Sequence, residues 1–131
     1  MQQVSPGRLV GIHDAVRPLV SIATIKRCFE AAAKKGNAIP AIDSEDTLRL
    51  VSDEGTQLLD RKKVMRIQTP QVFHASDIIS AYKHATDKTF TDDASVFESH
   101  GGSIHLVQGN KENVKITYPS DIEFASMMLQ T

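Results

Sequence analysis

The chain has little of several features that mark particular protein classes. Its 131 residues include one cysteine, Cys28, which excludes an intrachain disulfide and fits a reducing compartment. No apolar run approaches the ~20 residues of a transmembrane helix, and Met1 to Arg8 lack the apolar core of a signal peptide. The net charge of -1 provides no polybasic footprint for nucleic acid. The sequence therefore predicts a soluble, cytoplasmic single domain that binds neither nucleic acid nor a membrane.

Common catalytic and metal-binding motifs are also absent. The sequence contains no P-loop, no G-x-G-x-x-G and no G-x-S-x-G. The five histidines, His13 among them, show no zinc-ligand spacing, so we interpret them as structural or surface residues. The adjacent glycines Gly101 and Gly102 lie between an expected helix and an expected strand, which is typical of a helix stop.

Apolar runs and capping residues predict alternating strands and helices. Strands are expected at residues 9–12, 38–42, 64–67, 104–107 and 114–116. Helices are expected after the cap Ser21 up to Gly36, over 76–85, from Thr91 or Asp92 to His100, and from Pro119 onward. In the helix over 76–85, Ile78, Ile79 and Tyr82 are expected to face inward. This alternation predicts a three-layer α/β fold with a mostly parallel sheet. Pro40 should then lie at an edge or bulge, because proline cannot donate to a strand ladder.

Residues 43–61 have a different pattern. Thr47 to Val51 alternates, the turn residues Asp53-Glu54-Gly55 follow, and Gln57 to Leu59 returns the chain. The segment has few large apolar residues, so it is hard to bury in the main sheet. It is either a surface hairpin or an arm that embraces a second subunit.

Three charged residues are candidates for chemistry at strand ends. Asp14 follows an expected strand, where a carboxylate either holds Mg²⁺ or a sugar hydroxyl, or caps the turn. Arg17 either grips a phosphate through its planar guanidinium or forms a surface ion pair. Lys115, between Val114 and Ile116, points to the outer face of its strand or reaches a ligand.

Thr47, Thr69 and Thr91 are candidates for phosphate or hydroxyl contacts, or they are ordinary cap and turn hydroxyls. Arg61 lies at the base of the expected hairpin and, taken alone, is a solvated charge.

Four strings occur in order: His13-Asp14-Ala15-Val16-Arg17-Pro18, Thr69-Pro70-Gln71, Thr91-Asp92-Asp93-Ala94-Ser95 and Asn113-Val114-Lys115-Ile116-Thr117. Together with the pairs Asp46-Thr47 and Asp60-Arg61, they resemble the C-terminal half of the 2-C-methyl-D-erythritol 4-phosphate cytidylyltransferase family. The resemblance runs from about Leu9 to the end of the chain. Val16 departs from it, since many relatives carry a smaller residue there.

The resemblance implies an α/β fold: an incomplete, three-layer Rossmann-like nucleotidyltransferase sheet with a protruding β-hairpin arm. Residues 1–131 would be one domain, the C-terminal portion of a nucleotidyltransferase, with the arm at about 43–61. The implied enzyme is a homodimer with interlocked arms. It would transfer CMP from CTP to 2-C-methyl-D-erythritol 4-phosphate, releasing pyrophosphate, with Mg²⁺ as cofactor, in isoprenoid precursor synthesis by the non-mevalonate pathway.

The resemblance also implies roles for particular residues. Asp14, Arg17 and Lys115 would be catalytic, and Asp14 would also bind the metal. Ala15 and Lys115 would contact the nucleotide. The polyol phosphate would be bound by a larger set, in which the two arm residues Thr47 and Arg61 reach the neighbouring subunit's site: Asp14, Arg17, Thr47, Arg61, Thr69 and Thr91.

The glycine-rich loop with which the family opens does not occur in this sequence. We therefore expect little or no turnover from this chain alone, since each lost phosphate-binding donor costs on the order of 100- to 1000-fold. Two alternatives stay open. One is a pentitol (ribitol) phosphate cytidylyltransferase, and the other is a non-catalytic, truncated fragment for dimerisation or substrate binding.

Overall fold

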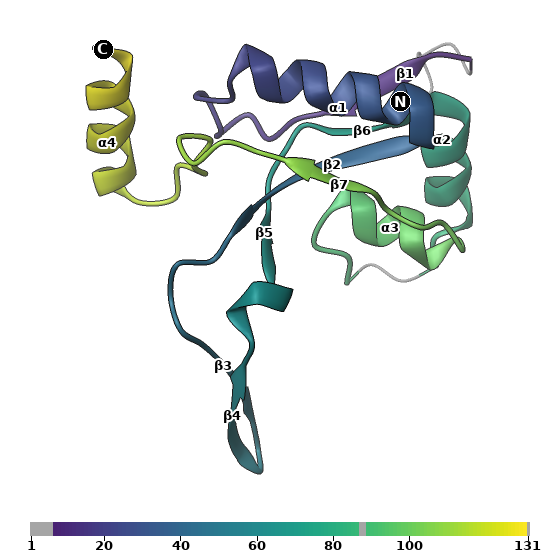
Figure 1. Cartoon of the computed structure of the whole chain (residues 1–131). Helices are drawn as coiled ribbons and strands as arrows, with labels where there is room; N and C mark the ends of the chain where they lie inside the picture. The colour runs from purple at the N-terminus through teal and green to yellow at the C-terminus, as the bar shows by residue number, and fades with distance from the viewer. Residues whose placement is uncertain (1–6, 87–88, 131) are drawn as a thin grey trace.

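The computed structural model describes residues 7–86 and 89–130. The prediction that no signal peptide is present concerns Met1 to Arg8, and residues 1–6 of this segment lie outside the described residues. Figure 1 shows a sheet with helices on both faces and a hairpin that extends away from it. The elements in chain order are β1 (Leu9–Ile12), α1 (Ile22–Lys35), β2 (Asn37–Asp43), β3 (Leu48–Ser52), β4 (Gly55–Leu59), the 3₁₀ turn η1 (Arg61–Lys63), β5 (Met65–Ile67), β6 (Gln71–His74), α2 (Ala75–His84), α3 (Asp93–Ser99), β7 (Leu106–Gln108) and α4 (Pro119–Leu129).

The main sheet has the strand order β1-β6-β2-β5, with β7 also paired to β2. Only the β2–β7 pair is parallel, and the other three pairings are antiparallel. The prediction of a mostly parallel sheet is therefore wrong. The chain passes from β2 to β5 and β6 through a hairpin instead of a helical crossover, and such a connection reverses strand direction. Strands β1, β2 and β7 still run in the same direction.

The sheet is the middle of three layers, as predicted. On one face Val72 and Ala38 pack with Cys28 and Ala32 of α1. On the other face the neighbouring residues Phe73 and Ile39 pack with residues of α2 and α3, in a cluster completed by Ile78, Ala81, Ala94 and Val96. Because adjacent strand residues point to opposite faces, two short strands serve both layers.

The predicted helix signals are confirmed. The Ser21 hydroxyl accepts from the Thr24 N–H at 3.0 Å, and Gly36 ends α1 in the left-handed region at φ 95°. Asp92 caps α3, and Pro119 is the first residue of α4. No helix among the described residues is long and apolar enough to cross a membrane.

Pro40 was predicted at an edge or a bulge; it lies inside β2 and is buried, so the edge position is wrong. β2 pairs with β6 at Ala38 and with β5 from Ala41 onward, so its partner on that side changes at Pro40. There the Pro40 carbonyl accepts from the Gln68 N–H at 2.8 Å. A proline fits because the ladder on that side is interrupted at this residue.

Three further predictions need correction. Residues 114–116 form no strand, and the Ile116 N–H bonds instead to the Val16 carbonyl at 2.8 Å. The strand predicted at 104–107 begins two residues later and ends one residue later, as β7. On α2 the buried residues are Ala75, Ile78 and Ala81. Tyr82, predicted to face inward, is 43% exposed because its hydroxyl turns to Asp93.

The hairpin predicted within 43–61 forms from β3 and β4, which pair in register from Leu48 with Leu59 to Ser52 with Gly55. It makes a separate two-stranded sheet and projects from the body in Figure 1. Leu50, Val51 and Leu58 are exposed on it.

Candidate active site

One cavity of about 680 Å³ gathers residues from segments that are far apart in the chain. Asp14 and Arg17 follow β1, Thr69 lies between β5 and β6, and Thr91 comes just before α3. Lys115 lies between β7 and α4. These five residues all line the cavity, so the structure brings together five of the eight site residues predicted from the sequence. The full lining is Asp14, Arg17, Ile67, Gln68, Thr69, Gln71, Tyr82, Ala85, Phe90, Thr91, Asp92, Asp93, Val96 and Lys115.

The turn after β1 is fixed to the cavity wall by hydrogen bonds. The Asp14 N–H donates to the Thr69 hydroxyl at 3.0 Å. The Arg17 Nε donates to Asp14 Oδ2 at 3.0 Å, so the two side chains form an ion pair. The Arg17 side chain is only 13% exposed, which strengthens this pair relative to a surface one.

The Arg17 guanidinium joins three segments. Besides Asp14, it donates from Nη1 to the Asn113 carbonyl at 2.7 Å and from Nη2 to the Ile67 carbonyl at 3.3 Å. Arginine has five N–H donors, so two remain for an anion in the cavity. Arg17 is thus both a structural link and a candidate ligand.

A cluster of buried amides holds the segment that leads to Lys115. The Asn113 Nδ2 donates to the Thr69 carbonyl at 2.8 Å and to Gln68 Oε1 at 3.3 Å. The Gln68 Nε2 donates to the Asn110 carbonyl at 2.9 Å. Gln68 is 3% exposed and Asn113 is fully buried. This cluster fixes residues 109–113 against the end of β5, and therefore sets the position of Lys115.

Gln71 and Asp92, which were not predicted to belong to the site, also line the cavity. The Gln71 Nε2 donates to Asp92 Oδ2 at 3.1 Å, and Gln71 Oε1 accepts from the Ala94 N–H at 2.8 Å. Burial opposes the charged form of Asp92, but hydrogen bonds from Ser95 and Gln71 outweigh it and hold its pKa below the ordinary value. Gln71 is a polar residue at the start of the buried strand β6, and this was the feature that could have indicated its role.

Tyr82 and Asp93 close the wall beside α3. The Tyr82 hydroxyl donates to Asp93 Oδ1. Burial, and then this hydrogen bond to a carboxylate, raise the pKa of Tyr82 above its ordinary value. Tyr82 is therefore neutral, and its hydroxyl hydrogen is already engaged in the bond to Asp93.

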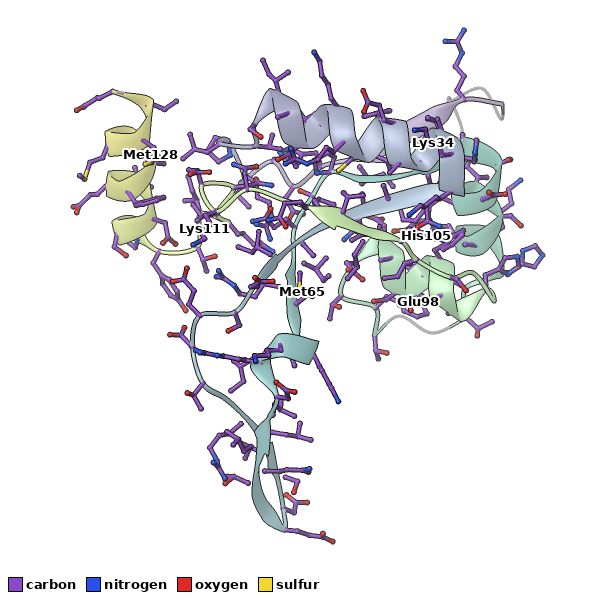
Figure 2. The ribbon with its side chains drawn as sticks, in the orientation of Figure 1. Lys34, Met65, Glu98, His105, Lys111 and Met128 are labelled. Atoms are coloured by element: carbon purple, nitrogen blue, oxygen red, sulfur yellow. The ribbon has the colours of Figure 1, made fainter. Side chains whose placement is uncertain are left out.

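Three predicted site residues do not line the main cavity. Ala15 is exposed in the turn after β1. Thr47 and Arg61 lie at the base of the hairpin and line a separate hollow of about 530 Å³. There the Arg61 Nη1 donates to the Glu45 carbonyl at 2.7 Å. Lys111, labelled in Figure 2, pairs with the Glu45 carboxylate at 2.6 Å, so the loop that follows β7 is tied to the hairpin base.

The predicted Mg²⁺ ligand Asp14 is a single carboxylate. Among the described residues, no group of three or more His, Cys, Asp and Glu side chains could hold a metal ion. Arg17 occupies Asp14 Oδ2, so Oδ1 is the oxygen that a cation would take. One carboxylate oxygen is enough only for a Mg²⁺ ion that takes its other ligands from water and phosphates.

Comparisons with known proteins agree with the resemblance. The model of the IspD family, described as 2-C-methyl-D-erythritol 4-phosphate cytidylyltransferase, matches residues 1–131. The chain is 44% identical over 125 residues to the protein of that name from Bacteroides thetaiotaomicron, covering 95% of this chain and 57% of the relative. It is 46% identical over 121 residues to the one from Bacteroides fragilis, covering 92% and 55%.

The fold also matches a crystal structure of 4-diphosphocytidyl-2C-methyl-D-erythritol synthase from Anaerococcus prevotii. The TM-score is 0.89 at 33% identity, over 99% of this chain and 60% of the other. The chain thus spans little more than half the length of these curated relatives.

Proposed function

The chain belongs to the 2-C-methyl-D-erythritol 4-phosphate cytidylyltransferase family, and we propose that its cavity binds 2-C-methyl-D-erythritol 4-phosphate for transfer of CMP from CTP. The observation that carries the proposal is the meeting of Asp14, Arg17, Thr69, Thr91 and Lys115 around one cavity. These residues offer both cationic donors for phosphates and hydroxyl or carboxylate groups for a polyol.

In the proposed reaction, a phosphate oxygen of the polyol phosphate attacks the α-phosphorus of CTP in line, and pyrophosphate leaves. Negative charge accumulates on the phosphoryl oxygens, so catalysis depends on positioning and on fixed positive charge. Lys115 and the two remaining N–H groups of Arg17 would supply that charge. The Asp14 carboxylate would accept a hydrogen bond from a polyol hydroxyl. The chemistry needs no covalent nucleophile.

Mg²⁺ is part of the proposal as an ion carried mainly by the substrate phosphates, with Asp14 Oδ1 as the protein ligand. Such an ion neutralises phosphate charge when bound. Ala15 and Lys115 are proposed to contact the nucleotide.

We further propose a homodimer in the cytoplasm, without nucleic-acid or membrane partners. The exposed apolar residues Leu50, Val51 and Leu58 on the hairpin support a contact with another subunit. Thr47 and Arg61 lie outside the cavity of their own chain. Their proposed role is to complete the site of the partner subunit.

Two measurements test the proposal: pyrophosphate release by the purified chain with CTP, Mg²⁺ and the polyol phosphate, and calorimetric binding of 2-C-methyl-D-erythritol 4-phosphate. We expect binding with little or no turnover, because the 131 residues contain no glycine-rich loop of phosphate-binding amides. Binding should weaken in Lys115→Met and be unchanged in the control Lys34→Met, on an exposed turn of α1.

The outcomes separate the candidate functions. A preference for ribitol 5-phosphate would replace the proposed substrate with a pentitol phosphate. Turnover at rates typical of cytidylyltransferases would show that the chain needs no further phosphate-binding loop. If the wild-type chain binds neither polyol phosphate, the proposed function is wrong.

A further inference from the structure

The imidazole of His13 connects the turn after β1 to the cavity wall. Its Nε2 lies 2.9 Å from the Arg17 carbonyl oxygen, and its Nδ1 lies 2.9 Å from Thr69 Oγ1. Thr69 lines the cavity and is 7% exposed, whereas the lining residues do not include His13. His13 can therefore influence a ligand only through these two partners, and Thr69 is the one whose side chain it contacts.

The two partners of the ring fix where its hydrogen lies. A carbonyl oxygen only accepts hydrogen bonds, so Nε2 carries a hydrogen and donates to Arg17. In the neutral imidazole Nδ1 then has no hydrogen and accepts. Its partner is the Thr69 hydroxyl. The hydroxyl hydrogen of Thr69 consequently points toward His13 and away from the cavity.

The hydrogen-bonding capacity of Thr69 can then be counted. A threonine hydroxyl has one hydrogen and two lone pairs. The hydrogen goes to His13, and one lone pair receives the Asp14 N–H at 3.0 Å. One lone pair remains, and it can only accept. A phosphate oxygen at this position would face another acceptor, whereas a hydroxyl of a polyol would donate to it.

We propose that His13 is a positioning residue that orients the Thr69 hydroxyl, so that Thr69 accepts from a hydroxyl of the substrate and leaves its phosphate to Arg17 and Lys115. This inference rests on the proposed function, because the polyol phosphate supplies both kinds of group. It assigns the contact at Thr69 to the polyol part of the ligand.

The first test needs no substitution and no ligand. Long-range ¹H–¹⁵N spectra of the histidine rings, recorded at pH 8 where imidazoles are normally neutral, distinguish the two tautomers. We expect a hydrogen on Nε2 of His13 and none on Nδ1. A hydrogen on Nδ1 would overturn the proposed orientation of Thr69.

The second test compares two ligands, 2-C-methyl-D-erythritol 4-phosphate and inorganic phosphate, by titration calorimetry at the same pH. Thr69→Val should weaken binding of the polyol phosphate by roughly 3- to 10-fold, which corresponds to one neutral hydrogen bond, and leave binding of inorganic phosphate unchanged. His13→Phe should weaken binding of the polyol phosphate similarly. It should bind inorganic phosphate at least as well as the wild-type chain, because the Thr69 hydroxyl hydrogen is then free to donate to phosphate. His13→Asn, which restores an acceptor near Nδ1, should recover the affinity.

Loss of affinity for both ligands in Thr69→Val would overturn the proposal and indicate that the Thr69 hydroxyl donates a hydrogen bond to phosphate. An equal loss for both ligands in His13→Phe would also overturn it and indicate a purely structural His13. If the wild-type chain does not bind the polyol phosphate, the proposed function fails, and with it the role assigned to Thr69. The ring spectra still judge the orientation by itself, so the two failures are distinguishable.

Discussion

Replacement of Gly109 by alanine should disturb the amide cluster that supports the cavity. Gly109 is buried directly after β7, and its N–H donates to the Ala41 carbonyl at 2.9 Å. A Cβ built on it would lie 2.2 Å from Gln68 Oε1 and 3.1 Å from Gln68 Cδ. Such a separation is impossible, and Gln68 is 3% exposed with little room to move. The glutamine must therefore leave its place.

The cost follows from the bonds that Gln68 makes. Its Oε1 accepts from the Asn110 N–H and from Asn113 Nδ2, both at 3.3 Å, and its Nε2 donates to the Asn110 carbonyl at 2.9 Å. Three neutral hydrogen bonds at about 1 kcal/mol each give about 3 kcal/mol. Alanine has less conformational entropy than glycine in the unfolded chain, and this stabilises the folded state by about 0.5–1 kcal/mol. We expect Gly109→Ala to lower the free energy of unfolding by about 2–3 kcal/mol.

Urea unfolding followed by circular dichroism measures this loss, and a double-mutant cycle identifies its cause. In a Gln68→Ala background the obstructing side chain is gone, so Gly109→Ala should cost almost nothing further. Gly7→Ala is the matched control, because no atom lies within 4 Å of a Cβ built there. A Gly109→Ala chain within about 0.5 kcal/mol of wild type, or full additivity with Gln68→Ala, would refute the reasoning.

Three further outcomes follow from titratable groups. Asp92→Ala should lower the free energy of unfolding at pH 7 by about 1–2 kcal/mol through loss of the α3 cap. Because the folded pKa of Asp92 lies below its ordinary 3.8, the wild-type advantage should persist down to about pH 4 and vanish as the pH falls further. Tyr82 has a raised pKa, so wild-type stability should decline above pH 10, and Tyr82→Phe should lack this part of the decline in alkaline melts. Burial raises the pKa of Cys28 to about 11, although Arg27 opposes the shift. Labelling by a thiol reagent at pH 8 should therefore follow the rate of unfolding, and rapid labelling of the folded chain would contradict this.

The local elements were predictable because their signals lie in adjacent residues. Ser21 and Gly36 bound α1 through backbone groups within four positions of each, so no distant residue is needed to place them. The same holds for Asp92 at α3 and Pro119 at α4. The hairpin was found for the same reason, since its alternation and its turn at Gly55 are contiguous.

Sheet direction was not predictable in this way. Alternation of strands and helices indicates an α/β fold, but β5 and β6 follow β2 through the hairpin and so return antiparallel. The place of Pro40 inside β2 was not predictable either. Its position is tolerated because the strand partner of β2 changes from β6 to β5 at that residue, which only the tertiary structure reveals.

Most of the residues predicted to contact ligands carry charged or hydroxyl groups that the sequence itself displays, and five of them line one cavity. The side chains that hold them were missed, because a buried amide is uninformative until its partner is known. Gln71 illustrates this: at 1% exposure it is a destabilising residue unless both ends of its amide are bonded. Its two shorter side-chain hydrogen bonds join it to Asp92 and Ala94, which lie more than 20 positions away. Only when the sheet brings β6 against α3 does it become the residue that fixes the cap beside Thr91. The support of a site is thus a property of the tertiary contacts, whereas its reactive groups are a property of the sequence.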